Sequence, residues 1–275
     1  KAKKIKKMSD VFITFYIAPQ VWAWKEKRTE IIRNHIDKLL VIFPFEKKWF
    51  KNKSVNATYV GHPILDEWKK KDKKELRNNL KLKSKDPLLV LFPGSRRQEL
   101  LRHLKIMMKC AKLIKLNIPN LQIVLGLASG LTLKDREKIP NDILIESNNP
   151  IGCLECADAA IVASGTATLE AAVFNVPSVI IYKSSFLSWL ITKFVIKTKT
   201  IGMANLIANK MIMPEYLQYN INENRIAQDI TSILSNKKKS LTIKNELTII
   251  KKKLGRPGAT SRAANIIYKN LKKSF

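Results

Sequence analysis

The sequence predicts an α/β protein built from two parallel β-sheets that are covered by helices. Short apolar, β-rich runs ending at proline or glycine alternate with helical stretches, which is the rhythm of βαβ units. A first, short series of such units is followed by a segment dense in charged residues, and a longer series then begins. We therefore expect two Rossmann-like lobes, the first of them incomplete because three strands are too few for a whole doubly wound lobe.

The first lobe is expected at residues 1–66. Its apolar runs predict strands at residues 11–17, 39–43 and 59–60, with a helix at 26–37 between the first two. The charged stretch at 68–86 predicts a solvated connector with a short helix at 73–80.

The second lobe is expected at residues 67–255 and carries the complete βαβ series. Leu100, Leu104, Met107, Ala111 and Ile114 recur at helical spacing and mark the buried face of a helix at 98–116. Apolar runs predict strands at 88–92, 121–127, 143–145, 159–162 and 178–182, and the remaining patterns predict helices at 165–174, 225–234 and 242–254. After the Gly255-Arg256-Pro257-Gly258 break, residues 256–275 predict a last helix, capped by Thr260, that packs back toward the first lobe.

The composition is strongly basic, with 51 Lys and Arg against 22 Asp and Glu and a formal charge of +29. Such a surface attracts nucleotides, anionic lipid or nucleic acid. Lysine greatly outnumbers arginine, which is consistent with drift in the composition of an AT-rich genome. A protein that recognises nucleic acid would be expected to use more arginine. The three cysteines form no regular framework, so we expect a reducing compartment and interpret Cys153 and Cys156 as small apolar residues on a short helix. No apolar run is long enough for a transmembrane helix.

The strongest motif is Ala163-Ser164-Gly165-Thr166-Ala167-Thr168-Leu169-Glu170, which follows a buried strand and opens a helix. Helix N-termini present free N–H groups and partial positive charge, so they bind phosphate. The Ser164 and Thr166 hydroxyls can donate hydrogen bonds, and Gly165 lets the backbone approach a ligand closely. The Glu170 carboxylate can accept hydrogen bonds from ribose hydroxyls. The motif predicts a nucleotide-diphosphate cradle; a capped helix without a ligand is the alternative.

A second strand–turn–helix motif is Phe92-Pro93-Gly94-Ser95-Arg96. A guanidinium at such a turn can bind a diphosphate bidentately, and this predicts a ligand role for Arg96. The spacing fits neither a Walker A loop nor GxGxxG. Asn205, in the otherwise apolar run 201–208, is a third candidate for holding sugar or phosphate, with a turn asparagine as the alternative.

Two aromatic segments suggest contact with a sugar, an acyl chain or a bilayer. Trp22 and Trp24 follow the first strand and either line a cleft or pack in the core. Phe186 and Trp189 belong to an apolar stretch fringed by lysines, which suits a helix at a membrane interface; a buried helix face is the alternative.

Together these motifs resemble the lipid-A-disaccharide synthases. The run Tyr16-Ile17-Ala18-Pro19-Gln20-Val21-Trp22-Ala23-Trp24 is similar to a tryptophan-alanine-tryptophan stretch of that family. Further matches follow in family order at residues 43–46, 60–63, 92–96, 163–170 and 204–206. The resemblance implies a GT-B glycosyltransferase with two Rossmann-like lobes, in which Arg96, Glu170 and Asn205 lie on the UDP side and residues 164–166 form the phosphate loop.

The resemblance also implies an inverting hexosyltransferase of lipid A biosynthesis in a Gram-negative bacterium. It would transfer 2,3-diacylglucosamine from its UDP carrier to 2,3-diacylglucosamine 1-phosphate (lipid X), releasing UDP and the β-1,6-linked disaccharide 1-phosphate. We expect no cofactor, no metal and no nucleic-acid partner. We expect a cytoplasmic location, peripheral on the inner face of the inner membrane, and the homodimer is left as an open alternative.

The first 80 to 100 or so residues of the resembled family, with the aspartate usually assigned as base, have no counterpart here. The catalytic residue is therefore unknown, and we expect this chain alone to be inactive or a fragment. The rival enzyme class is a related UDP-GlcNAc epimerase or peptidoglycan glycosyltransferase. A third alternative is a basic nucleic-acid or membrane-binding module without catalysis, which predicts salt-sensitive binding and no response to UDP.

Overall fold

The computed structural model describes residues 1–24, 26–68, 71–128, 139–185 and 200–271. The chain divides into two compact units. Within the described residues, unit 1 comprises 1–68 and 251–271, and unit 2 comprises 71–250 with its gaps. Each unit contains one parallel sheet, which confirms the predicted α/β class with two parallel sheets.

Unit 1 is built on a three-stranded parallel sheet in the order β1-β2-β3. The strands are β1 (Thr14–Tyr16), β2 (Lys38–Val41) and β3 (Ala57–Tyr59). The described helices of this part are α1 (Ala2–Met8), α2 (Val21–Trp24), η1 (Glu26–Arg28), α3 (Thr29–His35), α4 (Pro44–Lys51) and α5 (Ile64–Glu67). Leu39, Val41 and Phe50 are fully or almost fully buried at the centre of its core. The first strand is shorter than predicted, and the predicted helix at 26–37 is a 3₁₀ turn followed by α3.

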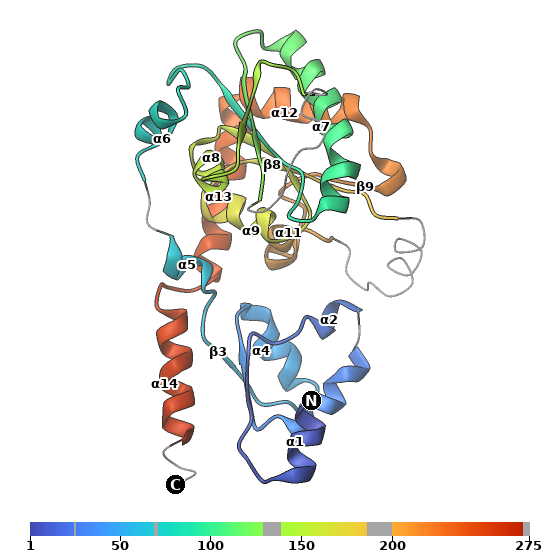
Figure 1. Cartoon of the computed structure of the whole chain (residues 1–275), viewed down its shortest axis with the longest axis vertical. Helices are drawn as coiled ribbons and strands as arrows, with labels where there is room; N and C mark the ends of the chain where they lie inside the picture. The colour runs from blue at the N-terminus through green and yellow to red at the C-terminus, as the bar shows by residue number, and fades with distance from the viewer. Residues whose placement is uncertain (25, 69–70, 129–138, 186–199, 272–275) are drawn as a thin grey trace. The chain divides into compact units, whose positions relative to one another are not determined.

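The C-terminal helix α14 (Ala259–Leu271) belongs to unit 1 (Figure 1). Its first N–H groups, those of Gly258, Ala259 and Thr260, donate to the Asp66 carboxylate over 2.6–3.0 Å. Thr260 was predicted to cap this helix, but it lies inside the first turn, and the cap is a side chain from far away in the sequence. The Arg262 guanidinium donates to the Val60 carbonyl at 2.8 Å and further joins α14 to the strand end after β3.

Unit 2 is built on a six-stranded, wholly parallel sheet in the order β6-β5-β4-β7-β8-β9. Its strands are β4 (Leu88–Phe92), β5 (Gln122–Gly126), β6 (Ile143–Glu146), β7 (Ala159–Ala163), β8 (Ser178–Tyr182) and β9 (Glu215–Leu217). Five of them match predicted apolar runs, and β9, short and only half-buried, was not predicted. The order is that of a Rossmann sheet, in which successive strands are added first on one side and then on the other, so that the strand order reverses between the two central strands, here β4 and β7.

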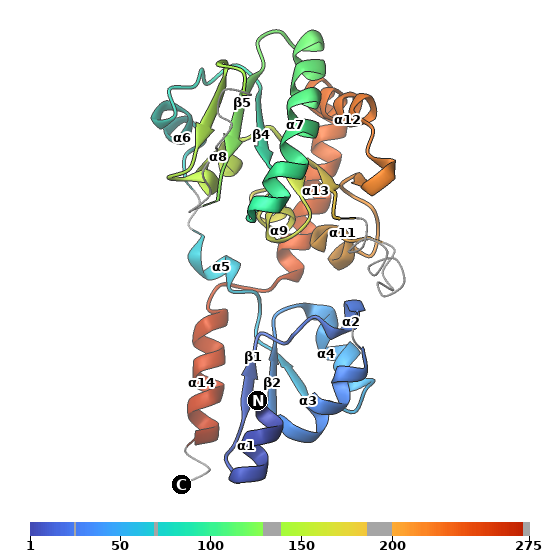
Figure 2. The same cartoon turned by 45° about the vertical axis from the view of Figure 1, so that its right-hand side comes forward.

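Helices cover both faces of this sheet, as Figure 2 shows with α7 and α12 on one side and α6 and α8 on the other. The described helices are α6 (Lys73–Asn79), α7 (Arg97–Asn117), α8 (Pro150–Cys156), α9 (Thr166–Val173), α11 (Met203–Ala208), η3 (Gln218–Asn220), α12 (Glu223–Ser235) and α13 (Lys237–Lys253). The predicted buried positions Met107 and Ile114 of α7 are fully buried against the sheet side. The carboxyl ends of the central strands are left to the loops that open α7 and α9.

Candidate nucleotide site

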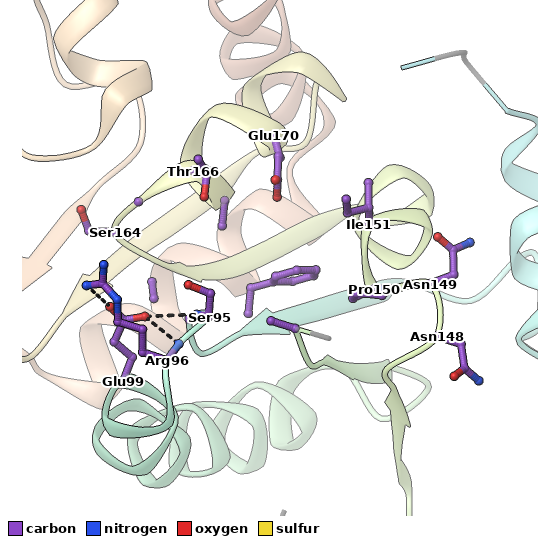
Figure 3. Close-up of a pocket in the computed structure, with 16 residues that line it drawn as sticks. Ser95, Arg96, Glu99, Asn148, Asn149, Pro150, Ile151, Ser164, Thr166 and Glu170 are labelled. Carbon is purple, nitrogen blue, oxygen red and sulfur yellow. Dashed lines mark hydrogen bonds and ion pairs between the residues drawn. The ribbon is translucent and has the colours of Figure 1, made fainter. Parts of the chain in front are cut away.

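A cavity of about 580 Å³ lies at the carboxyl ends of β4 and β7, inside unit 2. This size suits a small-molecule ligand. Figure 3 shows Arg96 and Ser164 toward one end of the cavity, Asn148 and Asn149 toward the other, and Thr166 and Glu170 between them. The cavity therefore occupies the crevice where the strand order reverses, which is where open parallel sheets bind their ligands.

The turn between β4 and α7 presents Arg96 to the cavity. Gly94 adopts φ +117°, and a Cβ there would lie 2.8 Å from the Cβ of Glu99, so this position requires glycine. Glu99 caps α7 by accepting the backbone N–H groups of Ser95 and Arg96 at 3.1 and 3.3 Å. The Arg96 side chain is 82% exposed, and within the described part of the chain its ion-pair partner is Glu99, at 3.7 Å. The guanidinium thus lies at the rim of the cavity with N–H donors exposed, and its ligand role stays a prediction.

The loop between β7 and α9 forms the opposite wall. Gly165 has φ +146°, and apart from its chain neighbours no described residue has an atom within 4 Å of a Cβ built there, so the backbone faces open space in the cavity. The N–H groups of Thr166 and Ala167 belong to the first turn of α9, so they have no acceptor within the helix. They point out of its N-terminal end. The Thr168 hydroxyl, not among the predicted residues, donates to the Gly165 carbonyl at 2.8 Å and stiffens the loop.

Glu170 projects from the first turns of α9 into the cavity (Figure 3). Burial raises the pKa of its carboxyl above the usual range. Among the described residues no hydrogen bond or ion pair to this carboxylate is found, so both oxygens are open to a ligand. Two hydroxyls of a ribose would be suitable donors, and this role of Glu170 stays a prediction.

The far end of the cavity is made by the loop before α8, which was not predicted as part of a site. Asn149 caps α8 by accepting the Gly152 N–H at 3.1 Å, and Glu146 accepts the N–H of Asn149 at 3.0 Å. These bonds hold the loop so that Ile151, 48% exposed, presents an apolar surface to the cavity. The Asn149-Pro150 helix start at the end of a strand was the available sequence signal.

Asn205 does not reach the cavity. Its side chain is fully buried, and Nδ2 donates to the Met213 carbonyl at 2.7 Å and to Glu215 Oε1 at 2.8 Å. Oδ1 accepts the backbone N–H groups of Ile212 and Met213. Every hydrogen-bonding position of the amide is occupied, which leaves none for the predicted direct contact with sugar or phosphate.

The predicted substrate contacts lie elsewhere or outside the described residues. Trp22 is 9% exposed, and its indole N–H donates to Glu46 Oε1 at 3.0 Å within unit 1. Its ring meets Phe45 edge-on with centroids 4.9 Å apart, so it packs in the core of that unit. The side chain of Trp24 and residues Phe186 and Trp189 lie outside the described residues.

Metal-binding and membrane-spanning features are absent from the part of the chain that the structure describes. No group of three or more described His, Cys, Asp or Glu side chains is gathered closely enough to hold a metal ion. No described helix is both long and apolar enough to cross a membrane. Cys110, Cys153 and Cys156 are buried free thiols, and burial raises the pKa of Cys110 and of Cys153 to about 12.

Solved structures with the same architecture are GT-B enzymes and related proteins. WaaG, a glycosyltransferase involved in lipopolysaccharide biosynthesis, aligns with 96% of this chain and 80% of its own at a TM-score of 0.57 and 12% identity. The structure of S. aureus MnaA with UDP aligns with 88% of this chain and 63% of its own at a TM-score of 0.61 and 14% identity. The two parallel sheets therefore give this chain the GT-B fold, which confirms the predicted fold class.

The lipid-A-disaccharide synthetase family model matches residues 2–268. Lipid-A-disaccharide synthase 1 of Legionella pneumophila (strain Paris) is 40% identical over 98% of this chain and 72% of its own length. The lipid-A-disaccharide synthase of Syntrophus aciditrophicus (strain SB) is 36% identical over the same shares. The chain therefore belongs to the lipid-A-disaccharide synthetase family, and the resemblance found in its motifs is confirmed.

Proposed function

We propose that unit 2 binds a UDP-sugar in the cavity between β4 and β7. The juxtaposition of Arg96 with the Gly165 loop supports this proposal most directly, because it puts an exposed guanidinium opposite the N-terminus of α9. The diphosphate lies between them, Glu170 accepts the ribose hydroxyls, and the uracil lies on the apolar surface of Ile151. Cationic and N–H groups neutralise the diphosphate, so binding requires no metal ion.

We propose further that the reaction is that of lipid-A-disaccharide synthases. The acceptor hydroxyl of 2,3-diacylglucosamine 1-phosphate bonds to the anomeric carbon of UDP-2,3-diacylglucosamine as the bond to UDP breaks. The hydroxyl proton passes to a general base, for which we assign no residue. Arg96 and the α9 N–H groups act on the leaving-group side, where they stabilise the charge that develops on UDP.

Calorimetric titration of UDP in the presence of EDTA tests the site. Arg96→Ala should weaken binding by about 10- to 100-fold, since hydrogen bonds to charged groups contribute roughly 1.5–3 kcal/mol. Arg97→Ala is the matched control, because Arg97 is exposed on the same turn and does not line the cavity. Equal affinities of the wild type and Arg96→Ala, or binding that requires a divalent cation, would contradict the proposal.

We also propose that the protein rests on the cytoplasmic face of the inner membrane. The support is the lysine-fringed apolar sequence around Phe186 and Trp189, the charge of +29 and the acyl chains of the proposed substrates. Phe186→Ser with Trp189→Ser should reduce cosedimentation with anionic vesicles while leaving the melting temperature nearly unchanged. A large fall in melting temperature with unaltered vesicle binding would assign the segment to the protein core.

A further inference from the structure

Glu215, at the start of β9, closes the N-terminal end of α11. Its Oε2 accepts the Ile201 N–H at 2.9 Å, and its Oε1 accepts the Gly202 N–H at 3.0 Å. The side-chain amide of Asn205 is the third donor to this carboxylate, at 2.8 Å from Oε1. One carboxylate thus satisfies two backbone groups ahead of the helix, which have no intrahelical acceptor of their own.

The arrangement has little freedom to change. Gly202 lies so close to the carboxylate that a Cβ there would be 3.1 Å from Glu215 Oε1. Asn205 is held by Met213 and Ile212 on its other side, as described above, so the amide cannot turn away. The Glu215 carboxylate therefore holds the turn at 201–202 in one position against the edge strand β9.

The same turn is hydrogen-bonded to the Ser164–Gly165 loop, which forms one wall of the cavity. The Met203 N–H donates to Thr168 Oγ1 at 3.2 Å, and that hydroxyl donates in turn to the Gly165 carbonyl at 2.8 Å. The Ser164 hydroxyl reaches the Ile201 carbonyl at 3.5 Å. Hydrogen bonds thus run from Glu215 through residues 201–203 to both Ser164 and Gly165.

We propose that Glu215 and Thr168 are positioning residues that hold the Ser164–Gly165 loop in the form that binds the diphosphate. Gly165 has an open side in the cavity and a backbone conformation that few residues adopt, so local packing alone does not fix it. Neither Glu215 nor Thr168 lines the cavity, and each acts through its neighbours. The inference rests on the proposed UDP site and extends it to the residues behind the loop.

Glu215→Gln is the sharpest variant because it keeps the shape and removes one acceptor oxygen. A glutamine offers one oxygen and one NH₂ group where three N–H donors converge, so at least one donor loses its acceptor. Thr168→Val removes the bridging hydroxyl, whereas Thr168→Ser retains it. Asp229→Asn is the matched control, since Asp229 accepts the Tyr216 hydroxyl at 2.8 Å beside the same strand without touching the 201–203 turn.

The measurement compares UDP with uridine, which shares the base and ribose but lacks the diphosphate. Glu215→Gln and Thr168→Val should weaken UDP about 10-fold and uridine less than about 2-fold. Thr168→Ser and Asp229→Asn should retain the wild-type ratio of UDP affinity to uridine affinity. A merely structural effect would not separate the two ligands in this way. If Glu215→Gln does not fold, the Thr168→Val and Thr168→Ser pair decides.

The outcomes separate the two proposals. Unchanged UDP-to-uridine ratios in Glu215→Gln and Thr168→Val, with wild-type binding and the Arg96→Ala loss both present, would overturn the positioning inference alone. Equal losses for UDP and uridine would also overturn it. A wild-type chain that binds no UDP would instead overturn the proposed function on which the inference rests.

Discussion

The indole N–H of Trp22 donates to Glu46 Oε1 across 3.0 Å within unit 1, where both side chains are buried. The other oxygen of Glu46 accepts the N–H groups of Ile42 and Phe43 at 3.2 and 3.0 Å, so the carboxylate also closes the start of α4. Desolvation raises the pKa of this carboxyl although its three hydrogen bonds oppose the shift. The tryptophan is therefore one of the groups that make a buried acid tolerable.

Trp22→Phe should destabilise unit 1 by about 1–3 kcal/mol, because it removes one donor from a buried carboxylate. Thermal or urea unfolding followed by circular dichroism measures the change. Trp49→Phe is the control, since Trp49 packs against Phe50 at the edge of the same core. An equal loss in both variants would show that ring size, and not the hydrogen bond, is responsible.

Asp66→Ala should loosen α14. Desolvation acts to raise the pKa of Asp66, but the three N–H groups at the start of α14 outweigh it and lower that pKa to about 2. Because the pKa is lower in the folded state, the contribution is complete above the unfolded value of 3.8 and is lost as the pH falls toward about 2. We expect a loss of about 1 kcal/mol, typical of a helix cap, and faster amide exchange in α14 at neutral pH. The variant should also lack the wild type's added loosening below pH 3.8; unaltered exchange in α14 would contradict the capping role.

The affinity for uridine should rise with pH through the titration of Glu170. Burial raises the pKa of this carboxyl, and only the ionised form accepts both ribose hydroxyls. Glu170→Gln should bind uridine about 10-fold more weakly at neutral pH and show little pH dependence. Uridine is the suitable probe because it carries no phosphate that titrates in the same range. A pH dependence that persists in Glu170→Gln would mean that another group is responsible.

The buried thiols should resist modification while the chain is folded. Burial raises the pKa of Cys110 and of Cys153 to about 12, and that of Cys156 is raised as well. A disulfide reagent such as DTNB at pH 8 should therefore label the native chain slowly and all three thiols after denaturation in urea. Rapid labelling of the native chain would contradict the interpretation of Cys153 and Cys156 as core residues.

Local signals along the chain were enough to predict the parallel-sheet class and the two loops that line the cavity. Buried strands such as β4 and β7 are continuous apolar runs, and Gly94 and Gly165 mark the turns that follow them. Period, turn chemistry and helix start all lie within a few residues of one another. The amino-acid sequence alone therefore brought Arg96 and Glu170 together as candidates, and both line the cavity.

Contacts between distant parts of the chain decide which polar side chains face the cavity and which support it. Asn205 lies in a motif that suggests a ligand, yet Ile212, Met213 and Glu215, beyond the end of its own helix, occupy its whole amide. The cap of α14 comes from Asp66, not from nearby Thr260, and Trp22 is turned toward Glu46. The direction of such a side chain depends on partners outside its own motif. Neither the hydrophobic period nor the spacing of residues along the chain identifies those partners.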